Sequence, residues 1–306
     1  MKRYILKRLL ISVITIWLIA TCCFFLLRIL PGNPFMTTEL LSQEQLDRMM
    51  AYYGLDKPLF EQYITYMGNL LHGDFGTSLK CTGQSVNDII AKRFPVSAQL
   101  GLEAFLLSFP IGLVLGIISA RKHGQTIDYV LVFFSVLGVC VPVFIVAALL
   151  QYVFAIKLNW LPVAQWNGFS YTILPVATLA IGSIATRTRS MRTLMLEVIN
   201  EDYMKTAKAK GLSKFRIIWS HQIRNAIIPM IPSLGMEIVG LLMGSFVVEQ
   251  IFVIPGLGAS FVNSIQNLDY TMTLGLTVFL AIFVVGANFI IDLIYCLVDP
   301  RIRVVK

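Results

Sequence analysis

The sequence predicts an all-α polytopic membrane protein with six transmembrane helices and both termini in the cytosol. Hydrophobic residues make up 57% of its 306 residues and charged residues only 14%, whereas soluble domains carry about a quarter charged residues. A helix needs about 20 apolar residues to cross the hydrocarbon core. Six segments have this apolar character, the fourth being the shortest: 9–29, 99–120, 129–156, 173–186, 226–248 and 271–298.

The basic residues set the orientation, because cytosolic connections near span ends carry an excess of Lys and Arg. They gather at four places that fall on one side of a six-span chain: Lys2, Arg3, Lys7 and Arg8; Arg121 and Lys122; the loop from Arg187 to Arg224; and Arg301, Arg303 and Lys306. The connection 249–270 on the other side has no Lys or Arg. The net charge of +8 is therefore a topology signal, and no nucleic-acid partner is expected.

Residues 1–98 are predicted to hold the first transmembrane helix, a retained signal-anchor, and an external helical segment. The run Leu30-Pro-Gly-Asn-Pro34 ends the span, because paired prolines around Gly-Asn favour a turn. Ser42-Gln-Glu-Gln45 is a capping box for a helix that ends near Gly54, and Pro58 suits the first position of the next helix. This segment is too small to enclose a ligand, so we expect it to pack on its own transmembrane helices rather than form an independent substrate-binding domain.

Residues 99–298 are predicted to form a transmembrane core of five helices, followed by a cytosolic tail at 299–306. Glycines at small-xxx-small spacing, such as Gly112 and Gly116, allow close helix packing. Prolines also lie inside the spans, where neighbouring helices or a cavity must satisfy the carbonyls they free. They are Pro110, Pro142, Pro175, Pro229 and Pro232.

Three acidic residues lie within the predicted spans: Glu103, Glu237 and Asp292. An ionised side chain at the bilayer centre costs at least about 2.5 kcal/mol on insertion scales. Each should therefore face a partner or an aqueous path. Glu237, near the middle of the fifth span, is the first candidate for a pathway residue and Glu103 the second. An ion pair or hydrogen bond to a neighbouring helix is the alternative for Glu237 and the favoured interpretation for Asp292.

The cytosolic loop 187–225 is predicted to contain two short helices joined at Gly211, called the cytosolic helix pair below. Gly takes the left-handed conformation at the end of a helix, and Ser213 can cap the next one. Leu212, Phe215, Trp219 and Gln222 are expected to share a face of the second helix. Such a pair suits docking into a groove of a protein partner. Interfacial binding to anionic membrane lipid through its lysines is the alternative.

The chain lacks the residues that several other functions require. It has no G-x-x-x-x-G-K-[ST] phosphate loop and no H-E-x-x-H sequence, so neither nucleotide hydrolysis nor zinc-peptidase chemistry is expected in this chain. Its three histidines are widely spaced, and its five cysteines form no framework. We predict a protein that is not itself an enzyme and needs neither cofactor nor metal.

Several short motifs distinguish this chain from other membrane proteins. Ala207-Lys-Ala-Lys-Gly211-Leu212 is similar to the Ala-x-x-x-Gly core of the loop through which ABC-importer permeases couple to their ATPases, although that loop commonly begins Glu-Ala-Ala where this chain has Lys205-Thr206-Ala207. The other motifs are Leu30–Pro34, Gly54–Pro58, Gly73–Gly76, Phe94–Ser97, Val248–Phe252, Pro255–Gly258 and Asp299–Arg303. Together they resemble the first membrane permease subunit of oligopeptide and dipeptide ABC importers over essentially the whole chain.

The resemblance implies a type I ABC importer transmembrane domain in the cytoplasmic (inner or plasma) membrane that moves peptides by alternating access. It implies a second homologous permease, two cytosolic ATPase subunits that hydrolyse ATP, and an external peptide-binding protein as partners. The residues expected to dock the ATPase are Glu201, Asp202, Ala207, Lys210, Gly211 and Leu212.

Other functions stay open on the sequence alone. The same machinery could import nickel or glutathione. A proton-coupled secondary transporter would use Glu237 or Glu103, although the inverted internal repeats common in such folds are not evident. A membrane scaffold or sensor without transport activity is the third alternative.

Overall fold

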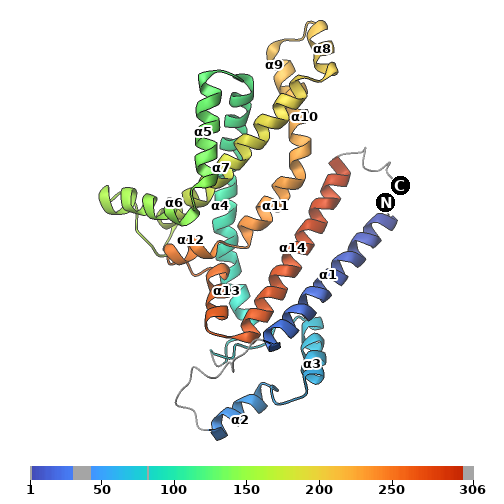
Figure 1. Cartoon of the computed structure of the whole chain (residues 1–306), viewed down its shortest axis with the longest axis vertical. Helices are drawn as coiled ribbons and strands as arrows, with labels where there is room; N and C mark the ends of the chain where they lie inside the picture. Colours follow the sequence, from blue (N-terminus) through green and yellow to red (C-terminus); the bar gives the residue numbers. More distant parts are fainter. Residues whose placement is uncertain (1, 30–42, 81–82, 299–306) are drawn as a thin grey trace. The chain divides into compact units, whose positions relative to one another are not determined.

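The computed structural model describes residues 2–29, 43–80 and 83–298, and these residues are almost entirely helical (Figure 1). The motifs Leu30–Pro34 and Asp299–Arg303, together with the capping Ser42 and with Cys81, lie outside the described residues. The chain divides into two units. Unit 1 contains residues 1–96 and 256–289, and unit 2 contains residues 97–255 and 290–306.

Unit 1 joins the N-terminal span, the external segment and the last span. The external helix α3 packs on α1, where the hydroxyls of Thr21 and Tyr63 are 2.9 Å apart and Arg28 Nε donates to Gln62 Oε1 at 3.0 Å. The external segment thus packs on its own transmembrane helices, as predicted. The helices of the unit are α1 (Lys2–Ile29), α2 (Gln43–Tyr52), α3 (Leu59–Leu71), the start of α4 (Val86–Arg121), α13 (Leu257–Gln266) and most of α14 (Tyr270–Val298).

A buried carboxylate also fixes the external segment of unit 1. Asp269, just before α14, accepts hydrogen bonds from Ser78 Oγ at 2.5 Å, Leu79 N at 3.1 Å and Met272 N at 3.1 Å. Because a buried carboxylate needs such donors, Asp269 holds the chain before α4 against the start of the last span.

Unit 2 contains the remaining helices, the cytosolic helix pair among them. Its elements are the rest of α4 and α14, α5 (Thr126–Cys140), α6 (Val143–Leu150), the π-helix η1 (Gln151–Lys157), α7 (Phe169–Ile199), α8 (Asp202–Ala209), α9 (Lys214–Arg216), the π-helix η2 (Ile217–Ile223), α10 (Arg224–Ile227), the 3₁₀-helix η3 (Ile228–Met230), α11 (Ile231–Leu242) and α12 (Phe246–Ile251).

The spans agree with the predicted number but differ in two of their shapes. Five helices in the described chain are long and apolar enough to cross a membrane, and the number rises to six if the bent pair 126–140 and 143–157 is one broken span. The pair bends by 102° because Val141 is extended, as expected before Pro142, whose ring disfavours a helical residue in front of it. The fourth span was predicted too short at 173–186, since α7 runs for 31 residues.

Glycines of α4 give α7 the room to approach closely, as their spacing predicted. A Cβ placed on Gly112 would lie 2.8 Å from Cβ of Arg187. A Cβ on Gly116 would lie 2.6 Å from Cβ of Met191 and 2.8 Å from the carbonyl oxygen of Thr188. Since real Cβ atoms do not come this close to their neighbours, the contact between α4 and α7 requires glycine at both positions.

Gly116→Ala is therefore expected to destabilise the protein, although alanine is the better helix former. Overpacking a contact of this kind costs about 1–3 kcal/mol. Gly240→Ala in α11 is the matched control, because nothing lies within 4 Å of its added Cβ. Thermal unfolding in detergent should show a lower midpoint for Gly116→Ala and an unchanged or higher one for Gly240→Ala; equal midpoints would contradict the close contact.

Candidate functional site

The cytosolic helix pair, α8 and α9 with the turn between them, lies at one end of unit 2. Figure 1 shows it beyond the end of α7, at the same end as the turn between α4 and α5 and opposite to α6 and α12. That turn carries Arg121 and Lys122, and the helix pair carries four lysines. The two basic connections share one end, as the cytosolic orientation requires.

Local sequence explains the shape of the helix pair. Gly211 takes the left-handed conformation at φ +70°, and its N–H donates to Lys208 O at 3.0 Å, which closes α8. Ser213 Oγ accepts a hydrogen bond from Arg216 N at 3.4 Å and starts α9. Both local predictions are confirmed. A Cβ added at Gly211 would meet nothing within 4 Å, so the tip of the turn is open.

The helix pair has a small core of its own. Met204 and Ala207 of α8 are buried against Ile217 of η2, with Leu212 partly buried beside them. Among the predicted docking residues, Ala207 and Leu212 therefore hold the pair together. The other four are exposed: Glu201, Asp202, Lys210 and Gly211.

Two aromatic side chains stand out on the helix pair and its extension. Phe215 is 70% exposed and Trp219 57% exposed, with ring centroids 5.9 Å apart. Gln222, predicted to share their face, is instead buried. The reason is that residues 217–223 form the π-helix η2, which changes the angular spacing on which the prediction relied.

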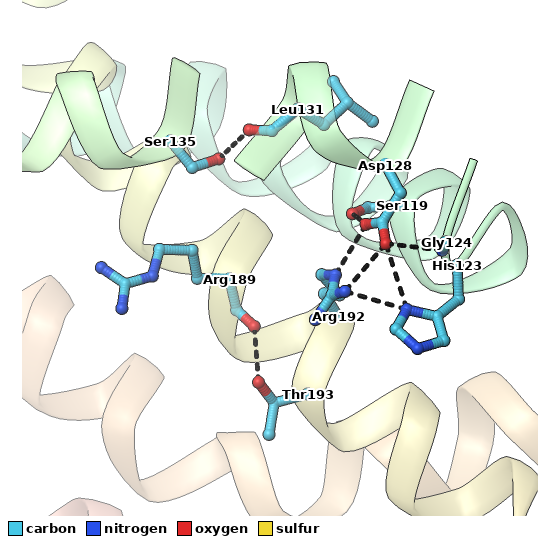
Figure 2. A network of polar contacts seen from close by, with 9 residues as sticks. All are labelled: Ser119, His123, Gly124, Asp128, Leu131, Ser135, Arg189, Arg192 and Thr193. Carbon is cyan, nitrogen blue, oxygen red and sulfur yellow. Dashed lines mark hydrogen bonds and ion pairs between the residues drawn. The ribbon is translucent and has the colours of Figure 1, made fainter. Parts of the chain in front are cut away.

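A charged network, missed in the sequence, fixes the turn between α4 and α5 to α7 (Figure 2). Asp128 of α5 is 2% exposed and accepts hydrogen bonds from Arg192 Nε at 2.7 Å and Arg192 Nη2 at 2.8 Å. Ser119 Oγ donates to it at 2.5 Å and Gly124 N at 3.1 Å, while His123 Nδ1 lies 3.1 Å away. We refer to these five residues as the Asp128 cluster.

The Asp128 cluster joins three helices and the turn between two of them, just before the helix pair begins. It takes Ser119 from α4, the turn residues His123 and Gly124, Asp128 from α5 and Arg192 from α7. A bidentate guanidinium–carboxylate pair with further donors is a strong, directional contact. These side chains therefore hold α7 and the turn together.

A second buried charge pair lies between α7 and α11. The Arg187 guanidinium donates to Glu237 Oε2 and lies over two rings of α4, 5.1 Å from the centroid of Phe105 and 4.9 Å from that of Phe109. Gly112 leaves space for its methylene groups. Arg187 is fully buried, whereas the Glu237 side chain keeps 24% of its surface exposed. Glu237 therefore has an ion-pair partner on a neighbouring helix, and this partner, Arg187, belongs to α7 rather than to the cytosolic loop.

The pair is only partly satisfied. Within the described chain, Nε and Nη1 of Arg187 and Oε1 of Glu237 are buried without a hydrogen-bond partner. A cavity of about 240 Å³ adjoins them and is lined by hydroxyl groups of Ser183, Thr186, Ser190 and Ser233. Glu103 is not among its lining residues and accepts a hydrogen bond from Gln99 Nε2 at 2.8 Å.

The described residues contain no cluster of three or more His, Cys, Asp or Glu side chains that could hold a metal ion. The oxygen-lined cavity beside Glu237 has a single carboxylate, fewer charged ligands than dedicated divalent-cation sites use.

Comparison with known proteins shows where the chain belongs. Residues 112–304 match the family described as binding-protein-dependent transport system inner membrane component, and residues 1–101 match the N-terminal domain of the same systems. The oligopeptide transport system permease protein OppB of Haemophilus influenzae is 44% identical over 99% of this chain and 100% of its own length. The dipeptide transport system permease protein DppB of Bacillus subtilis is 43% identical over 100% of this chain and 99% of its own.

Solved structures share the fold. An amino acid ABC transporter crystallised with histidines is similar at a TM-score of 0.51 and 17% identity, over 70% of this chain and 94% of its own. The MetNI methionine ABC transporter, in inward-facing conformations, is similar at a TM-score of 0.54 and 14% identity, over 69% of this chain and 96% of its own. With its five or six apolar spans and its full-length relatives, the chain belongs to the family of inner membrane permease components of binding-protein-dependent transport systems.

Proposed function

We propose that this chain is the first permease subunit of an ATP-driven importer of oligopeptides or dipeptides. Relatives at 44% and 43% identity over their full length carry peptide-transport names. The absence of a phosphate-binding loop from the sequence means that ATP must be hydrolysed on other subunits. Two cytosolic ATPase subunits, a second homologous permease and an external peptide-binding protein complete the proposed transporter.

The observation that carries this proposal is the cytosolic helix pair. It has its own buried core and an open tip at Gly211. It also exposes Phe215 and Trp219, and aromatic anchors are common at the centres of protein interfaces. We infer that Glu201, Asp202, Lys210 and Gly211 contact an ATPase subunit directly, and that Ala207 and Leu212 keep the pair in shape for this contact.

The proposed mechanism is alternating access. The binding protein delivers peptide from outside, and closure of the ATPase pair moves the docked helix pairs of the two permeases. The Asp128 cluster couples α7 to the turn between α4 and α5, so that the cytosolic ends of three helices move together. Glu237 contributes to the pathway from the polar cavity beside α7, and Glu103 of α4 is the second pathway candidate.

Purification and reconstitution test the proposal. The tagged chain is purified in mild detergent with its associated proteins and placed in liposomes with the external binding protein outside and ATP inside. We expect a second six-span permease and P-loop ATPases to co-purify, and labelled peptide to enter only when ATP is present. Peptide uptake that does not depend on ATP but is abolished by a protonophore would instead identify a secondary transporter. A chain that co-purifies alone and moves no peptide would also contradict the proposal.

A further inference from the structure

The cavity beside Glu237 continues into a larger one. The second cavity, of about 540 Å³, shares Thr186, Ser190, Met230 and Ser233 with the first, so the two adjoin each other beside α7 and are called the joined cavities below. Such a space is far larger than a single bound water requires. Small hydroxyl side chains make up much of the shared wall, and they can bond to peptide main chain without selecting a particular side chain.

The two cavities differ in the charged side chains that line them. The smaller one is lined by Glu237 and by its ion-pair partner Arg187, and the larger one by Arg189. Arg189 is exposed, and Figure 2 shows its guanidinium extending away from the Asp128 cluster, while its carbonyl oxygen accepts from Thr193 Oγ1 at 3.1 Å. Among the described residues this guanidinium has no ion-pair partner.

Only one of the two carboxylate oxygens of Glu237 accepts a hydrogen bond in the described chain. Its Oε2 accepts from Arg187, whereas its Oε1 is buried and has no partner in the described chain. A buried carboxylate oxygen without a donor is costly. An ammonium group offers three donors, and charge-assisted bonds of this kind are about twice as strong as neutral ones.

We propose that the joined cavities bind a short peptide by its two ends, with the α-ammonium at Glu237 and the α-carboxylate at Arg189. The inference rests on the proposed function and specifies where that transporter holds its cargo. A guanidinium fork matches a carboxylate well. Every short peptide has both termini, so a pathway that reads only these groups and offers hydroxyls between them accepts many sequences.

Arg187 is the positioning residue of this site. It lies at the wall of the smaller cavity, with its guanidinium over the rings of Phe105 and Phe109 and its side chain fully buried. By bonding to Oε2 it fixes the Glu237 side chain, whose second oxygen, Oε1, stays without a partner in the described chain. Arg187→Lys keeps the charge and should retain part of the peptide affinity, whereas Arg187→Gln should lose most of it.

The test uses the complete transporter, with both permeases and its ATPase subunits, in nanodiscs without nucleotide. The external binding protein is omitted, because it recognises peptides itself. Radiolabelled trialanine is the ligand, and N-acetyl-trialanine and trialanine amide are the competitors. For the native protein, each blocked peptide should compete at least tenfold more weakly than trialanine.

Two charge-removing variants give separate expected results. Glu237→Gln should weaken trialanine binding about tenfold. It should remove the preference for trialanine over N-acetyl-trialanine and leave the preference over trialanine amide. Arg189→Gln should have the opposite effect: it should remove only the preference over trialanine amide. Glu197→Gln and Arg224→Gln are matched controls, since both side chains are exposed and line neither cavity. Glu237→Asp, which keeps the carboxylate, should restore part of the preference for a free N-terminus.

Several outcomes would overturn the inference. They are native-like binding by Glu237→Gln, an equal loss for free and blocked peptides in a variant that still assembles with its ATPases, and no trialanine binding by the native complex. ATP-driven peptide uptake with the external binding protein present is measured on the same preparation. If uptake occurs while the binding pattern fails, the inference falls and the proposed function stands; if no peptide enters, the proposed function itself has failed.

Discussion

Gly211→Arg is expected to abolish co-purification of the ATPase subunits while the chain still inserts and pairs with the second permease. The turn at Gly211 is the open tip of the cytosolic helix pair, with nothing within 4 Å of an added Cβ. A long charged side chain there would fill the space that a partner's groove must occupy. Left-handed backbone at φ +70° adds a small strain, of the order of 1 kcal/mol, too little to unfold a multi-span protein.

The matched control for this prediction is Gly73→Arg. Gly73 also follows a helix, α3, with a positive φ, of +78°, and also has nothing within 4 Å of an added Cβ, but it lies in the external segment. Gly211→Asn provides a second control, because Asn tolerates the left-handed conformation. The measurement is the ratio of ATPase to permease after affinity purification. A normal ratio for Gly211→Arg, or an equal loss for Gly73→Arg, would remove the docking assignment from the helix pair.

Asp128→Ala is expected to produce the largest loss of stability among single substitutions. Removing one member of a buried charge pair costs about 3–5 kcal/mol, because the other charge stays without compensation. Arg192, Ser119 and the Gly124 N–H would all lose their acceptor. The midpoint of thermal unfolding in detergent should fall on the order of 10 °C, and ATP hydrolysis by any assembled transporter should no longer drive uptake efficiently.

Asp202→Ala removes an exposed ion pair, and its comparison with Asp128→Ala shows how much of the stability loss comes from burial of the pair. Asp202 also forms an ion pair, with Lys205 Nζ at 2.7 Å, but its side chain is 94% exposed against 2% for Asp128. Exposed pairs contribute little to stability, so its unfolding midpoint should match the native one. Asp128→Asn, which keeps an acceptor but no charge, should fall between the two. Equal midpoints for Asp128→Ala and Asp202→Ala would show that the cluster does not hold the three segments together.

Local sequence patterns accounted for the spans and for the shape of the helix pair. Apolar length predicted six spans, and Gly211 with Ser213 predicted the turn, because these signals act over a few residues. The same local patterns predict too short a fourth span, because the charges of Arg187, Arg189 and Arg192 are typical of a loop although these residues lie within α7. It also started the third span at 129, which left Asp128 outside the list of charged residues in spans.

The buried charge pairs depend on contacts far apart in sequence. Arg187 meets Glu237 50 residues further on and two rings of α4 about 80 residues before it. No periodicity joins these positions, and a single sequence gives no pairing between them. One weak signal existed. Phe105 and Phe109 are four residues apart and so share a helix face, and Gly112 follows them on the next turn. Two aromatic rings and a glycine on one face leave room for a long side chain from another helix to pack against them.

The π-helix η2 connects the cytosolic helix pair to the helices that carry Ser233 and Glu237. A change in the number of residues in η2 would alter how these two parts are rotated against each other. Each residue of an α-helix advances the chain by about 100°, and π-turns arise where an extra residue is accommodated in a helix. Deleting one residue within 217–223 would therefore turn α10 and α11 by roughly a quarter of a revolution against Phe215. A relative in this family with one residue fewer there would present Ser233 and Glu237 in another direction while its docking surface stayed the same.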